Sequence, residues 1–186
     1  MGWRDRGAVI KRIRLAVALA TAALAGGCFQ PLYGTTSTTE GSSVRTALTG
    51  VDVAQIDAPA ASDEARLAVQ IRNELLFGFT GGGSQGYSTH RLTVRISPSR
   101  AVMSVDRNTG LPLAESYTLN ATYSLAEIAT GKVVVSGRAS TGVGFDTIGS
   151  QRFARIGAIH DAERRAAKVI ADNITTRVAS YFMSGS

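Results

Sequence analysis

The sequence predicts an α+β domain in which a four-stranded mixed sheet carries two helices on one face, in the order strand, helix, three strands, helix. Two observations support this prediction. Apolar and polar residues alternate with a period of two in three segments between residues 87 and 145, as expected for half-buried strands. Two other segments, which begin near residues 63 and 159, place apolar residues at helical spacing instead.

The first strand is expected within residues 44–57. Its apolar markers are Val51, Val53 and Ile56. Ser62 is a suitable helix N-cap, and the two acids after it favour the positive end of a helix. The apolar face of this helix comprises Leu67, Ala68, Ile71 and Leu75. Gly78 and the glycine run 81–83 are expected to end it. Since a helical connection joins the first two strands, they should be parallel if adjacent.

The next three strands are expected to form an antiparallel meander. The first of them starts at Tyr87 and continues past Pro98 to Val105, with a bend at the proline. Turns are expected at residues 106–110 and 129–132. The alternating set is Leu92, Val94, Ile96, Tyr117, Leu119, Ala121, Tyr123, Leu125, Val133, Val135, Gly137 and Ala139. The other sheet face is polar and is left free for solvent or a partner.

The last helix is expected over about residues 159–182. Its apolar face comprises Ala162, Ala166, Val169, Ile170, Ile174, Val178 and Tyr181. Most of its charged residues lie elsewhere on the helix, so the helix should cover the sheet beside the first one.

The N-terminal segment is typical of a bacterial lipoprotein leader. A basic stretch precedes apolar residues 15–25, and Gly26 and Gly27 then lead to Cys28, the only cysteine. This apolar run is too short for a bilayer core, which needs about 20 residues, and it suits a cleaved signal. The thiol is expected to carry diacylglyceryl and the new terminus an acyl chain such as palmitate, because two or three chains anchor a protein firmly. The alternative is an ordinary signal peptide that contains a cysteine by chance.

Removal of the expected signal peptide sets the start of the mature chain and changes its net charge. Residues 1–27 are the expected signal peptide, 28–43 the lipidated terminus and flexible tether, 44–183 a single domain, and 184–186 a tail. The signal holds five of the 20 basic residues and one of the 14 acids, so 15 and 13 remain and the formal charge falls from +6 to +2. A nucleic-acid partner therefore loses most of its support. No Asp follows Cys28, which favours the outer membrane.

No constellation of residues predicts an enzyme. His90 and His160 have no neighbours at metal-ligand spacing, and the acids form no obvious pair for acid–base catalysis. The run 81–84 lacks the Lys-Ser/Thr ending of a phosphate loop and follows a helix. We therefore expect a binding or structural protein with no metal and no cofactor besides the lipid on Cys28.

Two patches resemble a known family. The run Cys28-Phe29-Gln30-Pro31-Leu32-Tyr33-Gly34 resembles the start of the mature LPS-assembly lipoprotein LptE of the alphaproteobacterial type. That branch usually has Gly where this chain has Phe29. Residues 107–110, with 114–117 and 119–122, resemble the family's central turn and strand. The resemblance implies a sheet with two helices on one side, a position as a plug inside the outer-membrane barrel LptD, and a role in delivering lipopolysaccharide to the outer leaflet.

The resemblance also implies which side chains contact lipopolysaccharide. These are Arg107 in the central turn and, before the last helix, Arg155 or Arg152. A guanidinium can hold a phosphate through two hydrogen bonds. We expect Arg107→Asp with Arg155→Asp to weaken lipopolysaccharide binding and leave the fold intact, whereas solvated loop charges would have no such effect.

One alternative function stays open. The chain would then be a periplasmic adaptor or activator lipoprotein of another cell-wall or lipid-transport complex, with a partner in the periplasm or the inner membrane.

Overall fold

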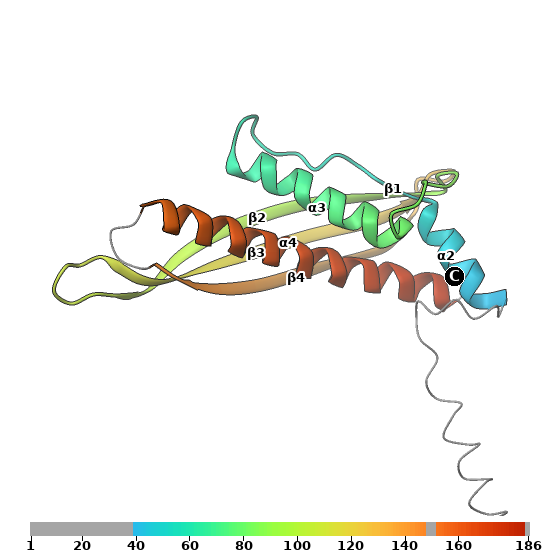
Figure 1. Cartoon of the computed structure of the whole chain (residues 1–186). Coiled ribbons are helices and arrows are strands. Elements are labelled where there is room, and N and C mark those ends of the chain that lie inside the picture. The colour runs from blue at the N-terminus through green and yellow to red at the C-terminus, as the bar shows by residue number, and fades with distance from the viewer. Residues whose placement is uncertain (1–38, 148–151, 185–186) are drawn as a thin grey trace, which may run out of the picture. The chain divides into compact units, whose positions relative to one another are not determined.

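A computed structural model describes residues 39–147 and 152–184, and the side chains of residues 44–147 and 153–184. The elements follow the chain in the order α2 (Thr39–Thr49), β1 (Val51–Val53), α3 (Asp63–Thr80), β2 (His90–Val105), β3 (Pro112–Glu127), β4 (Val133–Asp146) and α4 (Arg152–Met183) (Figure 1). The predicted order of strands and helices is confirmed, with one additional helix, α2. Cys28 and the residues assigned to the signal peptide lie outside the described residues.

The four strands form one sheet in the order β1-β2-β3-β4. β1 is parallel to the start of β2, with Val51 opposite His90, and α3 connects these two strands. The pairs β2–β3 and β3–β4 are antiparallel. This confirms the predicted mixed sheet, in which only the first pair is parallel.

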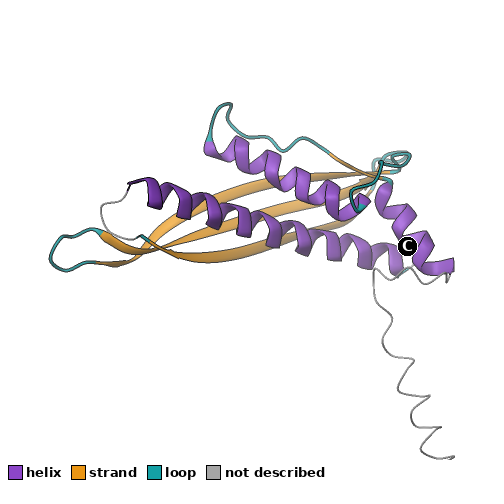
Figure 2. Ribbon diagram, viewed as in Figure 1, coloured by secondary structure: helices purple, strands orange, loops and turns teal. Residues whose placement is uncertain are grey.

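Both long helices lie on one face of the sheet (Figure 2). Successive residues of a strand point to opposite faces, so every second residue is buried under the helices. The buried apolar residues of β2, β3 and β4 are Leu92, Val94, Tyr117, Leu119, Ala121, Tyr123, Leu125, Ala139, Val143 and Phe145. On the uncovered face, Arg95, Thr122 and Arg138 lie side by side in register and are exposed. The prediction of a polar, uncovered face is confirmed.

The beginning of the domain differs from the prediction. Residues 39–49 are helical, and β1 has only three residues, so the strand expected over 44–57 and the tether expected to reach residue 43 are both wrong there. Leu48 is buried in the core, and Val44, one helical turn earlier, packs against it. The helix therefore gains its stability from tertiary burial, because its Thr, Ser and Gly residues are weak helix formers.

The ends of α3 follow the capping rules. Ser62 Oγ accepts a hydrogen bond from the N–H of Ala65 at 3.0 Å, and Gly81 ends the helix in the left-handed region at φ 62°. Gly78, expected to help end the helix, lies inside it. A Cβ at Gly78 would come 2.8 Å from Thr175 Oγ1 of α4, so this glycine allows α3 and α4 to approach each other closely.

β2 runs through Pro98 without a break in register, because Pro98 pairs with Leu119. The register shifts fall later, between Val102 and Val105. β1 pairs with β2 only as far as Leu92, so the edge of β2 beyond it has no neighbouring strand among the described residues. The Leu92 carbonyl faces this edge, where it accepts a hydrogen bond from Ala54 N. Pro98 is an even number of positions further along β2, so its backbone N and carbonyl face the same edge. The missing N–H of Pro98 therefore removes no hydrogen bond from the sheet.

α4 has 32 residues and begins seven residues earlier than predicted. Its buried face is rich in alanine and comprises Ala162, Ala166, Ala167, Ile170, Ala171, Ile174, Val178 and Ala179. Val169 is 41% exposed, so its assignment to the apolar face is wrong, as is that of Val133, which is 54% exposed at the irregular start of β4.

Across residues 39–147 and 152–184, no helix combines the length and the apolar character that crossing a membrane requires.

Candidate functional site

The candidate site lies at the turn between β2 and β3, at the end of the sheet opposite β1. Asp106 Oδ1 accepts hydrogen bonds from Asn108 N at 2.7 Å and Thr109 N at 3.1 Å. Gly110 adopts a φ of 67°, and its N–H donates to Asp106 O at 2.8 Å. The backbone N–H groups of Asn108 and Thr109 hold the pKa of the Asp106 carboxyl below its ordinary value. The predicted turn is thus confirmed as a short loop, closed by its own backbone.

Arg107 is exposed in this loop, and no described residue forms an ion pair with it. The adjacent carboxylate of Asp106 is turned toward the backbone amides of the loop. The guanidinium of Arg107 is therefore available to an anionic group from outside the domain.

Arg155 lies at the end of the first turn of α4 and forms an ion pair with Glu115. Its Nε and Nη2 donate to Glu115 Oε1 at 3.0 Å and 2.6 Å. The Glu115 side chain on β3 is 4% exposed, whereas that of Arg155 is 47% exposed. This ion pair fastens the start of α4 to the sheet, so Arg155→Asp would place a second acid against a buried one. We therefore expect Arg155→Asp to destabilise the start of α4, in contrast to the expectation from the sequence that the fold stays intact.

Arg152 is the first residue of α4, and its side chain lies outside the described residues. The structure thus places Arg107 and Arg155 at the same end of the sheet and gives them different surroundings.

Large apolar side chains are exposed around the same turn. They are Val102 (53%), Met103 (68%), Val105 (52%), Leu111 (46%) and Leu113 (46%). We call these five residues the tip surface. Phe153 is also exposed, by 88%, in the first turn of α4. The predicted strand that ends at Val105 did not indicate this surface, although five large apolar residues within the twelve positions 102–113 are a visible signal.

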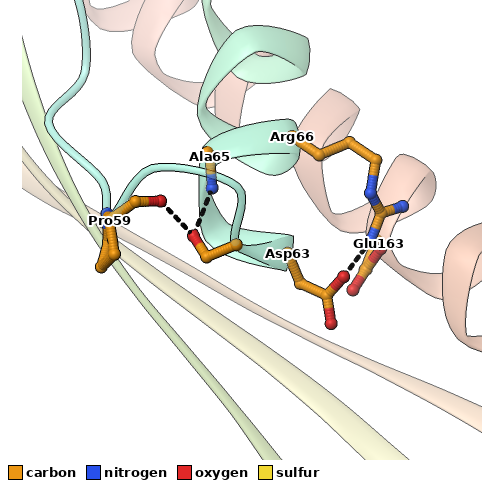
Figure 3. A network of polar contacts seen from close by, with 6 residues as sticks. Pro59, Asp63, Ala65, Arg66 and Glu163 are labelled. Carbon is orange, nitrogen blue, oxygen red and sulfur yellow. Dashed lines mark hydrogen bonds and ion pairs between the residues drawn. The ribbon is translucent and has the colours of Figure 1, made fainter.

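A second polar cluster joins α3 to α4 (Figure 3). The Ser62 hydroxyl donates to Pro59 O at 2.6 Å while it caps α3. Arg66 contacts Asp63 on its own helix at 3.1 Å and Glu163 on α4 at 2.9 Å. The Glu163 side chain is 8% exposed, so the charge of Arg66 compensates a nearly buried carboxylate. These contacts account for the cluster as a structural link between the helices.

A polar cleft of about 420 Å³ lies beside this link, between the start of α3 and residues 98–100 of β2. Tyr117 forms part of its wall, and burial, followed by the charge of Glu163, raises the pKa of Tyr117 to about 12. The phenol therefore stays protonated at neutral pH.

The histidines do not form a site with other ligands. His90 packs edge-on against Phe182 with ring centroids 5.1 Å apart, and His160 is half-buried on α4. In the part of the chain that the structure describes, no group of three or more His, Cys, Asp or Glu residues is placed to hold a metal ion.

Comparison with known proteins shows the fold. No family model matches the sequence, and no curated protein matches it. A protein described as a lipoprotein from Caulobacter crescentus has a similar structure, with a TM-score of 0.58, 18% identity, and coverage of 78% of this chain and 98% of its own.

Two further solved structures are similar. Lipoprotein B from Nitrosomonas europaea has a TM-score of 0.52 and 12% identity, over 82% of this chain and 94% of its own. A protein described as a homologue of a neuraminyllactose-binding haemagglutinin, from Helicobacter pylori, has a TM-score of 0.50 and 10% identity, over 84% of this chain and 95% of its own. Since one fold serves proteins with different names, the function has to be argued from the site.

Proposed function

We propose that this chain is an outer-membrane lipoprotein of the LptE type, anchored by lipid on Cys28, which occupies an LptD-like β-barrel and helps deliver lipopolysaccharide to the outer leaflet. It would bind and position its partners and catalyse no reaction. The barrel partner and the lipopolysaccharide contact are tested by separate experiments.

The observation that carries the proposal is the combination of an N-terminal sequence run with a fold. The run Phe29-Gln30-Pro31-Leu32-Tyr33-Gly34 follows directly on Cys28 in a chain whose domain has the fold of solved bacterial lipoproteins. The run supplies the specific resemblance, and the fold is the one expected of the LptE family. A generic lipoprotein leader alone would fit any anchored periplasmic domain equally well.

Arg107 supports the lipopolysaccharide contact. It is exposed, has no ion-pair partner among the described residues, and is carried by a loop that its own hydrogen bonds hold closed. A guanidinium so presented can bind a lipid phosphate in a bidentate manner without first breaking an internal contact. Arg155 would have to give up its contacts with Glu115 first, so we assign it to positioning α4.

Affinity purification of the full chain from membranes in mild detergent, followed by mass spectrometry, tests the barrel partner. We expect an outer-membrane β-barrel of large mass to co-purify, and we expect it to be lost for Cys28→Ser if the anchor is needed for assembly. Recovery of a periplasmic or inner-membrane complex instead would favour the adaptor function and contradict the proposal.

Binding of purified lipopolysaccharide tests the second half of the proposal. Arg107→Asp should weaken binding, while Arg177→Asp, an exposed arginine on α4 far along the chain from the turn, should have no effect. Equal binding by both variants would remove Arg107 from the site.

A further inference from the structure

We infer that the tip surface binds the acyl chains of the anionic lipid whose phosphate Arg107 holds; this rests on the proposed function and extends it from the head group to the hydrocarbon. The observation behind it is the exposure of five large apolar side chains, each between 46% and 68%, within residues 102–113. A cluster of exposed large apolar side chains of this kind indicates an interaction site.

The tip surface extends beyond the cover of the helices. On the helix-covered face of β3, Tyr117 is 4% and Glu115 is 3% exposed, but Leu113 further along is 46% exposed, as is Leu111 just before the strand. Arg155 of α4 contacts Glu115 and thus marks where the cover ends. The apolar stripe that forms the core further back therefore continues into a surface that no described residue covers.

The apolar residues lie on both faces of the two-stranded ribbon. Leu113 lies two positions before Glu115 along β3 and so belongs to the helix-covered face. Val105 lies opposite Pro112, which alternates with Leu113 and so belongs to the other face. A flat protein surface could cover only one face of the ribbon, whereas hydrocarbon chains can surround both.

The charges around the tip surface fit an anionic amphiphile. Arg107 stands in the loop beyond the apolar band, and Arg100 stands before it; both are exposed. The nearby acids are Glu115, Asp106 and Asp146. Glu115 is bound by Arg155, Asp106 is turned to the loop amides, and Asp146 lies in register with Ala114 on the uncovered face. Cationic groups thus flank the apolar band in a way that suits a lipid with phosphates and acyl chains.

Photocrosslinking with the full chain in Gram-negative cells tests this inference. Benzoylphenylalanine would replace Leu111 in one strain, the exposed loop residue Asn108 in a second, and Val169, which is 41% exposed on α4, in a control strain. After irradiation, alkaline hydrolysis removes ester-linked acyl chains from captured lipopolysaccharide. We expect the Leu111 adduct to keep a fatty acid on the protein, and the Val169 position to give no lipid adduct.

The other possible outcomes distinguish the acyl-chain inference from the proposed function. A lipopolysaccharide adduct at Leu111 without a retained fatty acid would overturn the acyl-chain inference and leave the proposed function standing. An adduct with a protein would show that the tip surface is a protein interface and would likewise overturn it. No lipopolysaccharide adduct at either Leu111 or Asn108 would contradict the proposed function as well.

A binding measurement supplies a second test. Leu111→Ser with Leu113→Ser should lower affinity for acylated lipopolysaccharide about tenfold, from the loss of two half-exposed leucine contacts. Affinity for the deacylated form, which keeps its phosphates, should not change. The same loss with both forms would overturn the inference, because it would indicate a disturbed loop rather than lost acyl contacts.

Discussion

Replacing Arg155 with Met removes the two hydrogen bonds to Glu115 Oε1 and keeps most of the aliphatic volume of the side chain. Hydrogen bonds to charged groups contribute about 1.5–3 kcal/mol, and removal of one partner leaves a buried carboxylate unpaired. Because Arg155 itself is 47% exposed, solvent compensates part of this loss. We expect Arg155→Met to lower the free energy of unfolding by about 2 kcal/mol.

A double-mutant cycle measured by chemical denaturation makes this prediction specific. Glu115→Gln removes the buried charge, so Arg155→Met on that background should cost only about 0.5 kcal/mol. Arg164→Met is the matched control, because Arg164 pairs with Asp161 on the helix surface, where both side chains are about half exposed. Its effect should stay within about 0.5 kcal/mol. If Arg155→Met costs no more than this control, the ion pair does not fasten α4 to the sheet.

Three further predictions concern the helices and the buried tyrosine. Gly78→Ala should lower the melting temperature, because overpacking against Thr175 costs about 1–3 kcal/mol and exceeds the gain of about 1 kcal/mol in helix propensity. Adding Thr175→Ala should restore stability in the double variant. A single variant Gly78→Ala that is more stable than the wild type would contradict the close approach of α3 and α4. Ser62→Ala should cost about 1 kcal/mol in denaturant unfolding, whereas Ser62→Asp should retain stability; equal losses would argue against capping. Since the pKa of Tyr117 is raised to about 12, the unfolded chain loses this proton first, so stability should fall as pH rises from about 10 to 12. Tyr117→Phe should flatten that decline in pH-dependent unfolding, and an unchanged slope would exclude Tyr117 as its source.

The sequence was a good guide wherever the local pattern and the tertiary contacts agree. Alternation of apolar residues identified β2, β3 and the covered face, because a half-buried sheet imposes the same period on every strand. The capping residue Ser62 and the left-handed Gly81 act through their own backbone neighbourhood, so both ends of α3 were readable locally.

Elements that depend on distant residues were not predictable. α2 is stabilised by burial of Leu48 in a core formed by later elements, and its own composition favours a loop. Gly78 resembles a helix end locally, but its role depends on Thr175 almost a hundred positions later. The first turns of α4 are likewise held by Glu115, which lies 40 positions earlier in the chain.

The candidate site was predictable in part. Arg107 and Arg155 were singled out by resemblance, yet only the ion pair with Glu115 distinguishes a positioning residue from an available one. The sequence shows the tip surface as a cluster of apolar residues. The exposure of these residues, however, depends on where the helices end above the sheet. The alternation of apolar residues within the strands does not predict that position.

The 16-residue strands β2 and β3 have a consequence for reach. At about 3.3 Å per residue each strand is about 53 Å long, and a bilayer with its head groups is about 40–45 Å thick. The helix α2 leads into β1 beside His90, at one end of β2, and the tip surface stands at the other end. A domain held at its α2 end at one face of a membrane would therefore be long enough to bring the tip surface level with the opposite face.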